Sequence, residues 1–230
     1  MEQRAILSAR QAGLNRSFVA DRFAAAPPPG RRAGPGNEAA LAAGVVPAGA
    51  RGDHDLNPDL LPEPPLRAAG VLVPLLERPD GLTVLLTRRT DHLHHHAGQI
   101  SFPGGRVDPG DEGPLGAALR EAEEEIGLPR ERVEPIGQLD LYITRTGFEV
   151  TPVVAFVDPP DAFAADPFEV AEIFEVPLAF IVDPANHQRH SRVFAGRPRS
   201  FYVFPWRDYY IWGATAGMLV NLAEVLRPAP

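Results

Sequence analysis

The sequence predicts an α/β fold of the α+β type, in which one mixed β-sheet is sandwiched between helices. Four apolar runs of strand length lie at 70–76, 82–87, 136–143 and 150–157. Helical periodicity lies between the second and third runs, at 115–126, and returns near the end of the chain, at about 212–226. Strands and helices in this order fit a mixed sheet flanked by helices best.

Turn and capping residues set the limits of these elements. Pro79, Asp80 and Gly81 join the first two strands into a hairpin. Gly127 suits the C-terminal cap of the first helix, and Pro129 prevents its continuation. The last third of the chain adds a short helical segment, a hairpin and a closing helix, at 177–181, at 190–194 with 200–204, and at about 212–226.

Composition limits the class of protein. A chain of 230 residues is long enough for one domain, which we place at 67–230 after a mostly flexible tail at 1–66 that is rich in Ala, Pro and Gly. A short helix is possible within that tail, at 5–23. The net charge of −8 disfavours a nucleic-acid polymer as partner. The absence of cysteine leaves only oxygen and nitrogen as metal ligands.

The expected cellular location follows from the lack of long apolar segments. No apolar run approaches the roughly 20 residues that cross a bilayer, and no signal-peptide core is present. We therefore expect a cytoplasmic protein without a membrane partner. These features leave the oligomeric state open.

Three carboxylates share one side of the helix predicted at 115–126. With Glu121 as reference, a step of about 100° per residue puts Glu124 and Glu125 on the same side and Glu123 almost opposite. Such a cluster destabilises a helix by a few tenths of a kcal/mol per like-charged pair, and a divalent cation would reverse that effect. Carboxylate oxygens suit Mg²⁺ or Mn²⁺. The alternative for the helix alone is a solvated acidic face.

The segment before this helix contains Gly104 and Gly105. Two adjacent glycines allow the backbone to pass close to a metal ion or a phosphate, and their amides can bind an anion. The alternative is an ordinary turn between strand and helix.

Together the glycines and the helix resemble the Nudix box. The family pattern Arg-Glu-apolar-x-Glu-Glu-x-Gly-apolar is matched at every position by 120–128. The first half departs from the pattern, because the fourteen residues between Gly105 and Arg120 are one more than the family has. The acidic residue expected to pair with Arg120 is therefore either Asp111 or Glu112.

The resemblance implies a metal-dependent hydrolase that cleaves a nucleoside diphosphate linked to another group. By similarity Glu121, Glu124 and Glu125 bind Mg²⁺ or Mn²⁺, and the carbonyl of Gly104 is an additional ligand. The ions would neutralise the pyrophosphate, orient a water for in-line attack and stabilise the leaving phosphate.

The sequence upstream of the box indicates the substrate. Leu85-Leu86-Thr87-Arg88-Arg89 leads through a histidine-rich stretch to Gly98-Gln99-Ile100-Ser101-Phe102-Pro103-Gly104-Gly105. This resembles the extra motif of the coenzyme A pyrophosphatase branch of the Nudix family, and the resemblance covers about residues 67–226. It implies cleavage of coenzyme A or a derivative to 4′-phosphopantetheine and adenosine 3′,5′-bisphosphate.

Coenzyme A carries a 3′-phosphate besides its pyrophosphate, so its site needs additional cationic or amide donors. Arg88, Arg89 and His96 are the candidate side chains, together with the backbone of Gly104 and Gly105. Because strand side chains alternate, we expect only one of the two arginines on the substrate face. The run of histidines does not favour zinc, since adjacent histidines do not share a face.

Glu169 and Glu172 are candidates for the general base, since the glutamates of the box are committed to metal. We favour Glu169. The alternative is that both acids begin a helical turn, where the helix dipole favours them.

Two other functions fit part of this pattern. The first is a Nudix hydrolase for ADP-ribose, NADH or a diadenosine polyphosphate. The second is a non-catalytic nucleotide-binding regulator, which would be expected to lose glutamates of the box, whereas this chain retains them.

Overall fold

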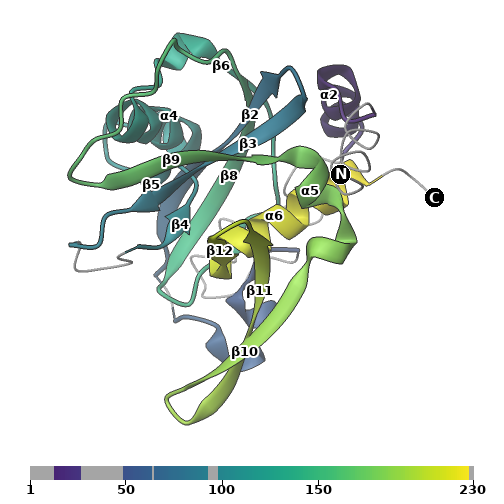
Figure 1. The fold of residues 1–230 in the computed structure, drawn as a ribbon. Helices are drawn as coiled ribbons and strands as arrows, with labels where there is room; N and C mark the ends of the chain where they lie inside the picture. The colour runs from purple at the N-terminus through teal and green to yellow at the C-terminus, as the bar shows by residue number, and fades with distance from the viewer. Residues whose placement is uncertain (1–12, 27–48, 64, 93–97, 228–230) are drawn as a thin grey trace.

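A mixed sheet of nine strands forms the centre of the computed structural model, which describes residues 13–26, 49–63, 65–92 and 98–227 (Figure 1). Strand β2 runs parallel to β8 and antiparallel to β3 and β5, while β9 pairs with the other edge of β3. The strands are β1 (Arg51–Gly52), β2 (Arg67–Arg78), β3 (Gly81–Arg89), β4 (Ile100–Ser101), β5 (Gly104–Arg106), β6 (Val133–Gln138), β7 (Tyr142–Ile143), β8 (Phe148–Val157) and β9 (Val170–Pro177).

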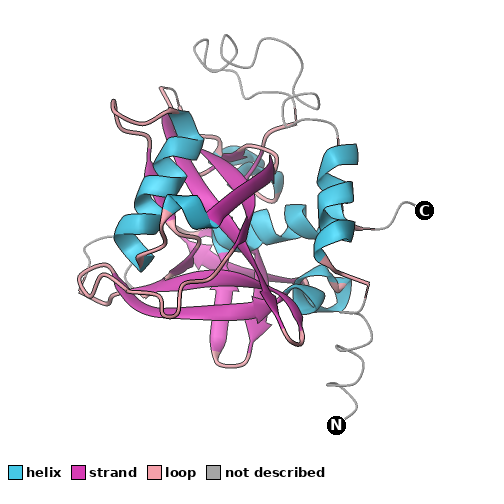
Figure 2. Ribbon diagram, turned by 90° about the horizontal axis from the view of Figure 1, so that it is seen from above, coloured by secondary structure: helices cyan, strands magenta, loops and turns pink. Residues whose placement is uncertain are grey.

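Helices cover both faces of this sheet, as predicted (Figure 2). On β2, Leu72 and Leu76 pack with Ala118 and Ala122 of α4 (Gly113–Ile126). Alternate residues of the same strand point to the other face, into a second core cluster that includes Leu222. That face carries α2 (Arg16–Ala25), α5 (Leu178–Val182) and α6 (Gly213–Leu226).

Most predicted elements are present. The β2–β3 hairpin turns at Pro79 and Asp80, and Gly127 caps α4 with φ 63°. Helix α4 begins two residues earlier than expected, because Pro114 suits the first turn of a helix. The structure corrects the alternative that Glu172 begins a helical turn, since it lies in β9.

A second sheet holds the hairpin predicted for the last third of the chain. It consists of β10 (Gln188–Phe194), β11 (Arg197–Trp206) and β12 (Tyr209–Trp212). Ala195 and Gly196 both have positive φ at the tip, as a two-residue primed turn requires. The third strand, which was not predicted, leads directly into α6.

Two described parts of the N-terminal 66 residues pack against the rest of the chain. Val19 and Phe23 of α2 are buried in the core cluster on the α6 face. Gly52 of β1 pairs with Ile143 of β7, and Asp53 accepts a hydrogen bond from the Tyr142 hydroxyl. The helix predicted at 5–23 appears as α2, which begins at Arg16, and residues 1–12 lie outside the described residues. The domain boundary at 66/67 stays a prediction.

Short 3₁₀ turns complete the described elements. They are η1 (Asp53–Asp55), η2 (Pro58–Leu60), η3 (Arg130–Arg132) and η4 (Pro184–Asn186). No described helix is long and apolar enough to cross a membrane.

Candidate active site

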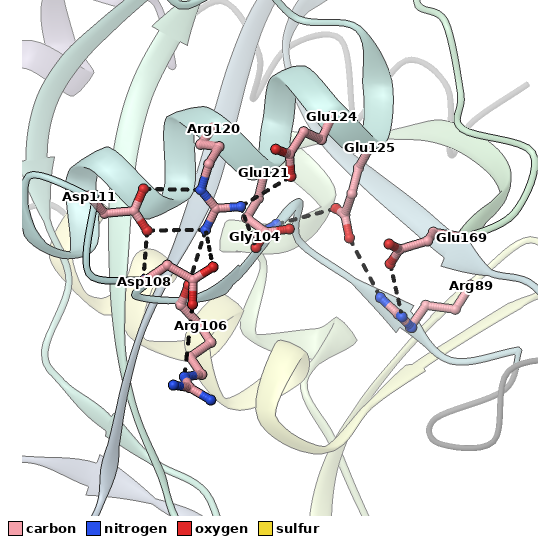
Figure 3. A network of polar contacts seen from close by, with 10 residues as sticks. All are labelled: Arg89, Gly104, Arg106, Asp108, Asp111, Arg120, Glu121, Glu124, Glu125 and Glu169. Carbon is pink, nitrogen blue, oxygen red and sulfur yellow. Dashed lines mark hydrogen bonds and ion pairs between the residues drawn. The ribbon is translucent and has the colours of Figure 1, made fainter.

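The acidic side of α4 faces strand β5, which carries the two glycines (Figure 3). Gly104 has φ 147°, a conformation that side chains rarely adopt. A Cβ at Gly105 would collide with the carboxylate of Glu121. Gly104 is therefore needed for its backbone conformation, and Gly105 is needed for the backbone to lie against Glu121.

Arg120 connects the helix to the loop that precedes it. Its Nε and Nη2 each lie 3.0 Å from an oxygen of Asp111, and this hydrogen-bonded pair lowers the pKa of the Asp111 carboxyl. Glu112 is exposed and does not replace it. Of the two acids that the sequence left open, Asp111 is therefore the partner of Arg120.

Glu121 and Glu124 accept hydrogen bonds from the same atom, Nη1 of Arg120, at 2.9 Å and 3.0 Å. The two carboxylates are thus close neighbours with a cationic nitrogen between them. Glu121 is partly buried, and this burial raises its pKa, as do the nearby charges of Glu124 and Glu169.

Glu125 is the buried member of the group, with a side chain only 5% exposed. Its carboxylate accepts a hydrogen bond from the Gly104 amide at 3.3 Å and from Arg89 Nη1 at 3.5 Å. Burial nevertheless raises the pKa of Glu125 to about 7, and the charges of Glu121 and Glu169 act in the same direction. A bound cation would favour the ionised form.

The donor set fits a hard divalent cation in its chemistry. It offers carboxylate oxygens and the backbone of Gly104, which are the hard donors that such cations prefer. In the described residues no three acidic or histidine side chains converge as metal ligands. Arg120 and Arg89 contact the glutamates instead. Since a guanidinium nitrogen already bridges two of them, the group accepts positive charge at this place.

The two arginines at the end of β3 point to different partners. Arg89 donates to Glu125 and, through Nη2, to Glu169 at 3.2 Å. Arg88 instead pairs with Glu172 at 3.1 Å, and Glu172 also accepts a hydrogen bond from Tyr209. Alternation along β3 therefore brings Arg89 to Glu125 and directs Arg88 to Glu172 instead. Glu169, in the turn before β9, reaches the same place through its contact with Arg89. His96 lies outside the described residues.

A cavity of about 580 Å³ adjoins this group, which is within the usual size of small-molecule sites. Arg89 and Gly104, which both contact Glu125, line one part of it. Its other walls come from the loop at 144–146, the start of α6 and the β10–β12 sheet. Sequence reasoning did not find these walls, because their residues belong to separate segments without a motif. The exposed apolar tip of the predicted hairpin was the one available signal.

Comparison with known proteins identifies the family of this chain. The NUDIX domain model matches residues 66–196, which is more than half of the chain. The chain belongs to the Nudix family. It is accordingly a hydrolase of a family that acts on pyrophosphate bonds in nucleoside diphosphate derivatives and generally uses divalent metal ions.

Bacterial Nudix proteins are similar over most of their length. The relative named uncharacterized Nudix hydrolase NudL from Escherichia coli O7:K1 is 42% identical over 158 residues, which cover 68% of this chain and 81% of that protein. The protein of the same name from Photorhabdus laumondii is 39% identical over 170 residues, covering 71% and 90%.

Solved Nudix structures are more distant. An Ap4A hydrolase from Caenorhabditis elegans is 22% identical, with a TM-score of 0.42, and the match covers 48% of this chain and 80% of that one. The NUDIX domain of Shewanella oneidensis NrtR, solved with ADP ribose, is 18% identical with a TM-score of 0.45, covering 70% and 88%.

Proposed function

We propose that this Nudix hydrolase cleaves the pyrophosphate of coenzyme A or a derivative in the cytoplasm, to give 4′-phosphopantetheine and adenosine 3′,5′-bisphosphate. The observation that carries the proposal is the contact between the upstream motif and the helix of the Nudix box. Arg89 and Gly104 belong to the motif at 85–105, and both bind Glu125. A motif that marks the substrate is thereby joined to the glutamates that would serve the reaction.

The box residues divide between metal binding and positioning in this proposal. Glu121, Glu124 and Glu125 would hold Mg²⁺ or Mn²⁺ with the Gly104 carbonyl, and Arg120 would orient Glu121 and Glu124. The bound metal would supply charge neutralisation on the pyrophosphate and an oriented water.

Glu169 would accept the proton of the attacking water, as the general base. Arg89 holds it beside Glu125, while its side chain remains 40% exposed and thus accessible to water. Glu172 would not take this role, because its carboxylate contacts Arg88 and Tyr209.

The test is product identification after incubation with coenzyme A, ADP-ribose, NADH and diadenosine tetraphosphate. Each substrate is assayed with Mg²⁺, with Mn²⁺ and with chelator. The proposal expects metal-dependent release of adenosine 3′,5′-bisphosphate from coenzyme A, well above the rates for the others. Faster cleavage of another substrate would overturn the substrate assignment and retain the Nudix chemistry.

A further inference from the structure

The cavity beside the glutamates has a second end that the chemistry of pyrophosphate cleavage does not use. Phe194 and Phe201 of the β10–β11 hairpin line it together with Trp212, which precedes α6. Phe201 and Trp212 form an edge contact with centroids 5.3 Å apart. Phe194 leaves 56% of its surface exposed, so its ring is accessible to a ligand.

Two arginines accompany these rings. The Arg145 guanidinium lies 4.8 Å from the centre of the Phe194 ring, and that of Arg192 lies 6.0 Å from the centre of the Phe201 ring. Both line the cavity, and neither forms an ion pair with any acid among the described residues. Arg199, which also lines the cavity, is instead paired with Asp59.

Charge and shape at this end indicate one class of ligand. Aromatic faces bind a flat heterocycle by stacking, and unpaired guanidinium groups bind phosphate oxygens by charge-assisted hydrogen bonds. Arg89 and Gly104 place the pyrophosphate end of the same cavity at Glu125. A ligand that spans the cavity would thus carry a diphosphate at one end and a phosphorylated aromatic nucleoside at the other.

We propose that Phe194, Phe201 and Trp212 hold the adenine of the substrate, and that Arg145 and Arg192 bind the phosphate on its ribose. This inference rests on the proposed function, and its phosphate site assigns the 3′-phosphate, which coenzyme A carries and ADP-ribose and dephospho-coenzyme A lack. It makes the loop at 144–146 and the β10–β11 hairpin the determinants of specificity.

The experiment measures binding of two inert ligands to the full chain by calorimetry, in the presence of Mg²⁺. Adenosine 3′,5′-bisphosphate and adenosine 5′-monophosphate differ only in the 3′-phosphate. We expect the bisphosphate to bind about tenfold to a hundredfold more tightly. Arg145→Gln and Arg192→Gln should each reduce that ratio by about tenfold or more, while leaving the affinity for the monophosphate nearly unchanged.

Arg189→Gln is the matched control. Arg189 lies on β10 with Arg192 and carries the same charge. It contacts Tyr202 but does not line the cavity. The ratio of the affinities for the bisphosphate and the monophosphate should be the same in this variant as in the wild type. Circular dichroism of all three variants checks that each is folded.

Two binding results would overturn the inference, and one kinetic result would do so as well. One is equal affinity of the wild-type chain for the two ligands, and the other is an equal loss for both ligands in the arginine variants. Neither result depends on turnover, so the binding experiment can contradict the inference without contradicting the proposed function. If coenzyme A is cleaved but dephospho-coenzyme A is cleaved with the same kcat/KM, only the inference is wrong.

Discussion

Helix α4 and the β10–β12 sheet belong to different parts of the candidate site, and they differ in how their residues are distributed along the chain. The helix places Arg120, Glu121, Glu124 and Glu125 within two turns, next to a pair of glycines. The other part gathers side chains from a loop, a hairpin and a strand end that lie far apart in sequence. Chemistry that depends on one helix can be identified from spacing, whereas a binding surface built by tertiary packing cannot.

The largest expected effect concerns α4. Glu125→Gln keeps the volume of the side chain and removes its charge, so turnover should fall by about a thousandfold or more. The stability of the fold should be unchanged or higher, because a buried charge disappears. Kinetics and thermal unfolding measure the two effects.

Glu123→Gln is the control on the same helix, since Glu123 is exposed on the opposite side. It should retain wild-type turnover. Loss of activity in both variants would mean that any charge change on α4 matters, and the special position of Glu125 would be refuted.

The next effect concerns the proposed base. Glu169→Gln should lower kcat by about a hundredfold to ten-thousandfold with little change in KM, because only proton transfer is lost. Glu172→Gln should leave kcat nearly unchanged, since that carboxylate pairs with Arg88 and Tyr209. Steady-state kinetics of the two variants tests this, and the reverse order of effects would exchange the two roles.

The smallest of these effects separates the two arginines of β3. Arg89→Gln removes the donor that holds both Glu125 and Glu169, and it should lower kcat/KM by about tenfold to a hundredfold. Arg88→Gln should lower kcat/KM by less than threefold, because the surface ion pair of Arg88 with Glu172 contributes little. Equal losses measured in a kcat/KM comparison would contradict the alternation of the two side chains.

Local patterns explain how far the sequence could predict the fold. The α4 helix, the β2–β3 hairpin and α6 follow from periodicity, a two-residue turn and a glycine cap, all of which act within a few residues. Strand β9 was missed, because its partner β3 lies about ninety residues away and provides its hydrogen bonds. The packing of α2 against the core could not be predicted, because the proline-rich sequence that follows the helix indicated a flexible tail.

The residues of the candidate site also divide into those that a local motif predicts and those that only tertiary packing brings together. The spacing of the Nudix box indicated all three glutamates, but it left Asp111 and Glu112 as alternatives, since the loop carries one additional residue. The structure selects Asp111 through its two hydrogen bonds with Arg120. Arg145 and Arg192 belong to no pattern, and only the cavity connects them.

Mn²⁺ binding without substrate tests most directly whether the α4 glutamates are metal ligands. Electron paramagnetic resonance would compare the wild-type chain with Glu125→Gln and Glu123→Gln at equal concentrations. We predict bound Mn²⁺ in the wild type and in Glu123→Gln, with affinity reduced by about tenfold or more in Glu125→Gln. Equal Mn²⁺ affinity in all three proteins would contradict the assignment.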